Sequence, residues 1–233
     1  AAAAVDKEEI VAYNETLTWE KLRVLMSTPS AILGYIQGVP GCLPWGMLYT
    51  FFNDYLHVQR GMTVPAATLV ITIFGIGGIC GSLFGGWMGQ RLFNRNPKYQ
   101  VLMMGTSTIV GVLPILFMIN VSEPSRPSTL PIVYIMSFVG GFIININGPN
   151  IKTLMCNVCV PEVLGSAFAL FALTDDVGKG FGPYVVYVMI DQAFQGNRRA
   201  AFNAISMCWL VCGVLLLCLS MTYESDMGML MPQ

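Results

Sequence analysis

The chain has 233 residues, of which 55% are hydrophobic and 11% are charged, and its mean hydropathy is +0.63. This composition excludes an ordinary soluble domain. The net charge of −1 excludes the strongly basic surface of a nucleic-acid-binding protein, so we expect no nucleic acid among its partners.

Six apolar segments of about bilayer length follow one another, separated by short connectors. About 20 residues of helix, rising roughly 1.5 Å each, cross a hydrocarbon core of about 30 Å. In lipid, an open chain satisfies its backbone hydrogen bonds only by forming helices. The predicted spans are residues 31–52, 67–89, 100–120, 129–149, 164–190 and 200–220. The sequence therefore predicts an all-α integral membrane protein, a six-helix transmembrane bundle embedded in the lipid bilayer.

Two other segments flank the bundle and divide the chain into residues 1–30, 31–221 and 222–233. In the first, Thr18–Met26 alternates apolar and charged residues at helical spacing. This pattern predicts an amphipathic helix on the membrane surface, or a linker helix that only positions the first span. The last segment is polar and rich in methionine, and we expect it to be poorly ordered.

Basic residues are unevenly distributed between the two ends of the predicted bundle. Seven lie on the side of the N-terminus, namely Lys7, Lys21, Arg23, Arg91, Arg95, Lys98 and Lys152. Four lie on the other side, namely Arg60, Arg126, Arg198 and Arg199. The positive-inside rule then predicts that both termini face the cytosol, stroma or matrix, although Arg198 and Arg199 oppose this bias.

Amide side chains occur within the first and fourth spans. The first span contains Gln37, followed by Pro40 and Pro44, which predict kinks. The fourth span ends in the amides Asn145, Asn147 and Asn150. Amides in a span either line a cavity or bond to neighbouring helices, and both roles stay open here.

The second span has a glycine at every fourth position. These glycines are Gly77, Gly81, Gly85 and Gly89. Glycine costs about 1 kcal/mol per residue in a soluble helix, but a repeated small-residue face lets another helix backbone approach closely in a membrane. We expect a tight packing seam along this face, which also suits helices that rock against each other.

The segment Gly86–Arg95 resembles a loop motif of the major facilitator superfamily. In that family, loops between paired spans carry a glycine, then Asp-Arg, then a basic cluster, and Gly86, Arg91 and Arg95 match this pattern. Gln90 stands where the family has Asp, and Phe93 where it usually has glycine. In the family this loop forms a latch with the opposite half of the transporter, and these two positions depart from the residues of that latch motif.

Further stretches resemble the spinster-like branch of that superfamily. They are Gly148–Lys152, Asn157–Glu162 and the small-residue restart Gly165–Leu170. The resemblance covers about residues 20–221 and implies one half of a major facilitator fold, the carboxyl half of a twelve-span transporter. It also implies that the first span lines the substrate path and that the solute is organic or lipid-like.

The fifth span contains three ionisable residues within five positions, Asp175, Asp176 and Lys179. Each charge in a span costs about 2.5–3.5 kcal/mol on insertion scales, so such groups usually face a cavity or a partner. Lys179 is three and four residues from the two acids and can pair with either. The cluster is then a structural ion pair, a substrate or coupling-ion site, or the cap of a helix that starts at Thr174 or Asp175.

Nothing in the sequence indicates an enzyme. Cys156 and Cys159 have CxxC spacing without a second pair or a nearby histidine, which does not support a metal site. His57, the only histidine, is expected at the surface. We found no nucleophile–base pair, phosphate loop or haem ligand set, and we expect no cofactor and no metal.

Two functions compete. The first is a transporter half that moves a small organic or lipid-like solute by alternating access with a second six-helix half. Its substrate or coupling site is predicted at Asp175, Asp176, Lys179, Gln37, Asn145 and Asn147. The alternative is a transporter-derived accessory subunit of a large membrane complex with other membrane subunits as partners and no transport of its own, because fold does not fix function.

Overall fold

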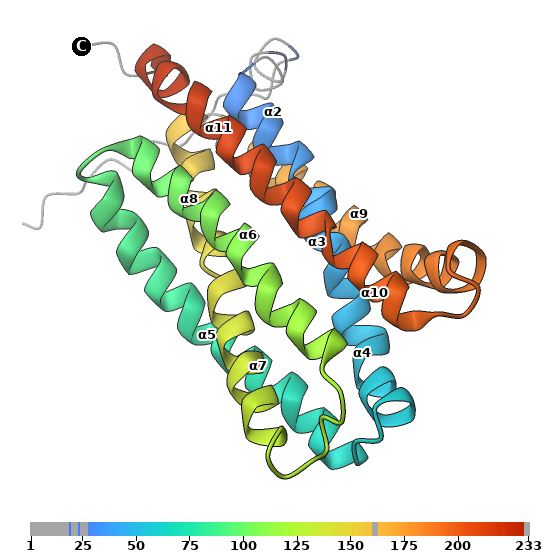
Figure 1. Ribbon diagram of the computed structural model, residues 1–233. Coiled ribbons are helices and arrows are strands. Elements are labelled where there is room, and N and C mark those ends of the chain that lie inside the picture. Colours follow the sequence, from blue (N-terminus) through green and yellow to red (C-terminus); the bar gives the residue numbers. More distant parts are fainter. Residues whose placement is uncertain (1–18, 20–22, 24–27, 160–162, 231–233) are drawn as a thin grey trace, which may run out of the picture.

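The computed structural model describes residues 19, 23, 28–159 and 163–230, and the secondary structure in this part of the chain is helical (Figure 1). This confirms the all-α fold. The amphipathic helix expected at Thr18–Met26 lies, apart from two positions, outside the described residues and stays a prediction.

The first predicted span is a series of short helical elements instead of one helix. Pro40 cannot donate a hydrogen bond to Ile36, four residues earlier, and the first helix ends there. After Pro44 the chain passes into π-helical turns, which are common near functional sites. The elements are α2 (Pro29–Ile36), α3 (Gly38–Gly46), η1 (Met47–Phe51), α4 (Phe52–Asp54) and η2 (Tyr55–Gln59).

Three of the other five segments have clear start signals. The side chains of Thr63, Asn96 and Asn197 accept hydrogen bonds from backbone N–H groups in the first turns of three helices, as N-caps do. The helices are α5 (Val64–Phe93), α6 (Pro97–Asn120), α7 (Leu130–Ile144), α8 (Asn147–Val158), α9 (Leu164–Val188) with η4 (Met189–Ala193), α10 (Arg198–Ser206) and α11 (Cys208–Leu230).

Four helical stretches in the described chain are long and apolar enough to cross a membrane: Val64–Phe93, Pro97–Asn120, Leu130–Val158 and Arg198–Met227. The other two predicted spans lie beside them in the same bundle (Figure 1). These two are not among the four long apolar helices, because the first span is broken into short elements and the fifth carries three charges. Together the six segments form the predicted bundle.

The expectation that the segment after residue 221 is poorly ordered is corrected by the structure, because α11 continues as a helix to Leu230. Asp226 is only 4% exposed and accepts a 2.8 Å hydrogen bond from the backbone N–H of Ser30. The Asp226 side chain thus caps the start of α2, and this contact helps to hold the tail as part of α11. This contact also places the beginning of α2 and the end of α11 at the same end of the bundle (Figure 1).

The helices pack as two three-segment repeats, residues 28–120 and 130–230. The three most extensive helix pairs are α5 with α7, α3 with α9, and α6 with α11. The segments of the first repeat are α2–α3, α5 and α6, and those of the second are α7–α8, α9 and α11. If each segment is replaced by its counterpart in the other repeat, the pair α5–α7 becomes α9–α3, and the pair α6–α11 stays the same. This pattern is that of two three-helix repeats related by a pseudo-two-fold axis, and an odd number of spans inverts the second repeat in the membrane.

Two separate apolar cores lie along the bundle. One includes Met47, Phe52 and Phe202, and the other includes Tyr35, Met104 and Leu216. Along α6, Val101 and Met104 belong to one core and Val112 and Ile115 to the other, with Thr108 between them. The level of Thr108 is therefore the middle of the bundle, where the packing changes from one core to the other.

Candidate functional site

A cavity of about 560 Å³ lies at this middle level. Its walls come from the first span, α7, α8 and α9, with contributions from α5, α6 and α11. Five of the six predicted site residues line it, namely Gln37, Asn145, Asn147, Asp175 and Lys179. Residues that are far apart in the sequence are thus brought to one place.

The cavity lies between the two broken segments of the bundle. The break between α2 and α3 falls at Gln37, and the break between α7 and α8 falls at Asn145 and Ile146. These segments are the first members of the two repeats, so the breaks occur in corresponding segments. In transporters built from repeats, paired discontinuous helices mark the binding site.

Amide side chains stabilise the backbone at both breaks. The Gln37 side chain is buried; its Nε2 donates to the carbonyl of Gly34 at 3.0 Å, and its Oε1 accepts from the Cys212 thiol at 3.1 Å. At the other break, Asn145 Nδ2 donates to the carbonyl of Gly141 at 2.8 Å. Interrupted helices in a membrane need such partners for the backbone groups that the break leaves free.

The other two amides of the fourth span have different surroundings. Asn150 is buried and joins three helices, because its Nδ2 donates to the carbonyl of Gly85 at 2.9 Å and its Oδ1 accepts from Gln100 at 2.9 Å. Asn147 lines the cavity, and its Oδ1 is buried without a hydrogen-bond partner among the described residues. Asn150 therefore binds helices together, whereas Asn147 has an unpartnered acceptor at the cavity.

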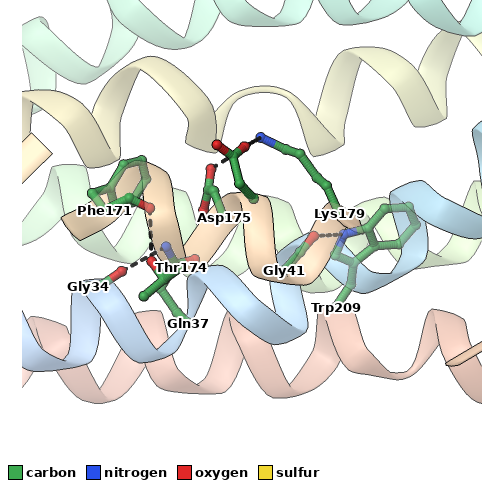
Figure 2. A network of polar contacts seen from close by, with 9 residues as sticks. Gly34, Gln37, Gly41, Phe171, Thr174, Asp175, Lys179 and Trp209 are labelled. Carbon is green, nitrogen blue, oxygen red and sulfur yellow. Dashed lines mark hydrogen bonds and ion pairs between the residues drawn. The ribbon is translucent and has the colours of Figure 1, made fainter. Parts of the chain in front are cut away.

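The three ionisable residues of α9 are not equivalent, and Figure 2 shows two of them, Asp175 and Lys179. Lys179 Nζ lies 3.6 Å from Asp175 Oδ2 and 3.9 Å from Asp176 Oδ1, so the ammonium group is shared between both carboxylates. The Asp175 side chain is 22% exposed and lines the cavity, whereas that of Asp176 is 74% exposed and does not. Of the three residues predicted for the site, Asp176 therefore lies outside the cavity.

Close packing against α3 holds Asp175 in the cavity wall. A Cβ at Gly178 would lie 2.7 Å from the carbonyl oxygen of Val39, and a Cβ at Gly46 would lie 2.7 Å from the carbonyl carbon of Gly182. Small residues allow this approach of two backbones. The helix runs without interruption from Leu164 to Val188, which excludes the alternative of a helix that starts at Thr174 or Asp175.

Aromatic residues form a wall of the cavity that the sequence reading did not include. The Trp45 ring lies 5.5 Å from that of Tyr49 in a stacked arrangement and 5.8 Å from that of Trp209 in an edge-on arrangement. Trp209 Nε1 donates to the carbonyl of Gly41 at 2.9 Å. The position of Trp45 after the break was a usable signal, but nothing in the sequence places Trp209 beside it.

The glycines at every fourth position of α5 face α7 and α8. The Cβ positions of Gly77, Gly81 and Gly85 fall against the backbone of Phe138, Phe142 and Ile146, and that of Gly89 falls against the Asn150 side chain. All four glycines are buried. The seam lies within this chain, next to the break between α7 and α8.

The loop-motif residues sit at the end of α5 and after it. Arg91 lies over the Trp87 ring, with its guanidinium carbon 4.2 Å from the ring centroid. Gln90, which replaces the acid of the family motif, donates to Asn94 Oδ1 at 2.8 Å. Arg95 is exposed, and a Cβ at Gly86 would meet only Pro149, at 3.9 Å. Arg91 is thus held by an aromatic ring of its own helix, and Gly86 is not required by packing within this chain.

Comparison with known proteins agrees with this architecture. The family model described as Major Facilitator Superfamily matches residues 34–226. Autophagy-related protein 22-2 of Sclerotinia sclerotiorum is 27% identical over 156 residues, and autophagy-related protein 22 of Coccidioides immitis is 22% identical over 160 residues. These matches cover 64% and 66% of this chain but only 22% and 26% of the two relatives.

A solved structure shares the fold. A bacterial homologue of the human lysosomal transporter Spinster, in an inward-facing and unoccupied conformation, superposes with a TM-score of 0.61 at 12% identity. The match covers 97% of this chain and 53% of the other. The six spans therefore correspond to about half of that transporter. With a family match across residues 34–226, the chain belongs to the Major Facilitator Superfamily and has the fold of one half of a spinster-like transporter.

Proposed function

We propose that this chain supplies one six-helix half of a secondary transporter that moves a small organic or lipid-like solute by alternating access. The observation that carries the proposal is the cavity between two helix breaks in corresponding segments of the two repeats, midway between the apolar cores. A solute site at this level can be exposed alternately to either side when two bundles rock around it.

The lining of the cavity suits an amphiphilic solute. Its lining combines charged and amide groups with the aromatic rings of Trp45, Tyr49 and Trp209. A second cavity of about 350 Å³ shares Trp45 and Tyr49 with the first and continues along apolar residues of α5, namely Phe74, Ile79 and Leu83. A solute with a polar group and an apolar body matches this sequence of surroundings.

Asp175 is the candidate coupling residue. It is the single carboxylate among the described residues that line the cavity, and its only ionic partner in the described part of the chain, Lys179, is shared with Asp176. A carboxylate in this position can exchange a proton or a cation as the cavity opens to either side. Asp176 is on the same helix and also pairs with Lys179, but its side chain does not line the cavity. It therefore serves as the matched control.

The proposed partner is a second six-helix half. The side of α9 away from α3 exposes small residues, namely Gly165, Ala169, Ala172 and Gly180. A Cβ at Gly165 or Gly180 would meet nothing within 4 Å. Such a face allows the close approach of another membrane helix. Asp176 and Lys179 border this face, so a partner would also cover their charges.

The test compares Asp175→Asn with Asp176→Asn in vesicles that contain the complete transporter. The parent is first screened for proton movement with organic acids, amines, sugars and lysophospholipids. Asp175→Asn should abolish coupled uptake of the active solute, and Asp176→Asn should retain most of it. Equal behaviour of both variants would refute the coupling role. Absence of any uptake, with isolation in fixed stoichiometry with unrelated membrane proteins, would instead support the accessory-subunit function.

A further inference from the structure

One end of the cavity carries a positive charge that nothing in the described chain balances. Of the charged side chains that line the cavity, Asp175 and Lys179 lie 3.6 Å apart and form an ion pair, in which Lys179 is shared with Asp176 outside the cavity at 3.9 Å. The third, Lys152, makes no hydrogen bond or ion pair with any described residue. The cavity as formed by these residues therefore has one excess ammonium group.

The groups next to Lys152 are also available. Lys152 is in the second turn of α8, and the first turn places Asn147, Gly148 and Pro149 on the same cavity. Asn147 Oδ1 is buried without a partner in the described part of the chain. A Cβ at Gly148 would meet nothing within 4 Å. The positive end of the α8 dipole adds to the lysine charge at this place.

We propose that Lys152 and Asn147 form an anion subsite that binds a carboxylate or phosphate group of the transported solute. The inference rests on the proposed function, because it assigns one end of the solute to one end of the same cavity. The Lys152 ammonium contacts the anionic oxygens. Asn147 Oδ1 accepts a hydrogen bond from a hydroxyl, amine or acid proton next to them. The apolar body of the solute lies toward Trp45 and Tyr49, so the solute is an organic anion.

The subsite gives partners to two groups that have none in the described part of the chain. The buried acceptor of Asn147 gains a hydrogen bond that the described residues do not supply. The Lys152 side chain is exposed and lines the cavity, so its ammonium group can meet a counter-charge there. A bound anion with an adjacent donor satisfies both groups at once, whereas a cationic or purely apolar solute satisfies neither.

The test measures binding of phenyl compounds to the complete transporter in detergent by tryptophan fluorescence, since Trp45 and Trp209 line the cavity. The probes are hydrocinnamate, phenyl phosphate, the neutral hydrocinnamamide and the cationic phenethylamine. One or both anions should bind about tenfold more tightly than the neutral amide, as expected for one charge-assisted hydrogen bond. Comparison of the two anions distinguishes a carboxylate site from a phosphate site.

Variants assign the preference to Lys152. Lys152→Gln should reduce anion binding about tenfold and leave binding of hydrocinnamamide unchanged, and Lys152→Arg should keep the preference. Lys98→Gln, which changes a lysine outside the cavity, should behave as the parent. Equal affinity for charged and neutral probes, or an anion preference that survives Lys152→Gln, would overturn the subsite but leave the transporter proposal intact. Failure of every probe to bind the parent would overturn both.

Discussion

The packing seam between α5 and α7 can be tested by two alanine substitutions in one helix. Gly75 and Gly81 are six residues apart, but only Gly81 faces α7. A Cβ at Gly81 would lie 2.7 Å from the carbonyl carbon of Phe142 and 2.8 Å from its Cα. A Cβ at Gly75 would meet nothing within 4 Å. The backbone of Phe142 cannot rotate away as a side chain can, so the two helices must separate in Gly81→Ala.

The difference between the two variants measures the seam itself. Both substitutions gain the same intrinsic helix propensity, up to about 1 kcal/mol, so this contribution cancels. Overpacking at a tight contact costs about 1–3 kcal/mol, which changes the unfolding equilibrium by a factor of roughly 5 to 150. We expect Gly81→Ala to be less stable than Gly75→Ala by this amount.

The assay is equilibrium unfolding in mixed detergent micelles, with increasing fractions of dodecyl sulfate and helix content followed by circular dichroism. Gly75→Ala should unfold at the parental midpoint or above it, and Gly81→Ala well below it. Coincident midpoints for the two variants would refute the assignment of the seam. A loss of stability in Gly75→Ala alone would show that the exposed side of α5 is the packed one.

Three further outcomes follow from the structure. Cys156 is exposed and should react with a polar maleimide from the side of the N-terminus. Cys159 is buried, and burial raises the pKa of its thiol to about 11. At neutral pH too little of the Cys159 thiolate forms for reaction before the protein unfolds. Labelling of Cys156 from the opposite side contradicts the topology. Asp226→Ala leaves the buried N–H of Ser30 without its acceptor and should lower the free energy of unfolding by about 1–3 kcal/mol, measured in the same detergent titration; a parental midpoint would contradict the cap. Gly46→Ala brings a Cβ within 2.7 Å of the Gly182 backbone and should destabilise the α3–α9 pair by a similar amount, about 1–3 kcal/mol, whereas no change would place that contact elsewhere.

The sequence by itself determined the class of protein, the number of spans and the kinds of residue at the site. Apolar length and the obligation to satisfy backbone hydrogen bonds are local properties, and they identified six helical segments without knowledge of their arrangement. The costly residues inside those segments, Gln37, Asn145, Asn147, Asp175 and Lys179, were identified for the same reason, and all five line one cavity.

Only the tertiary structure decided which neighbour each residue has. Asp175 and Asp176 are adjacent in the sequence, yet one lines the cavity and the other does not. Gly75 and Gly81 belong to the same glycine-rich helix, yet only Gly81 meets another backbone. Asp226 continues a helix beyond the apolar segment because a distant residue, Ser30, needs an acceptor. These differences depend on the rotation of each helix about its axis, which is set by packing against segments far away in the chain and leaves no local pattern in the sequence.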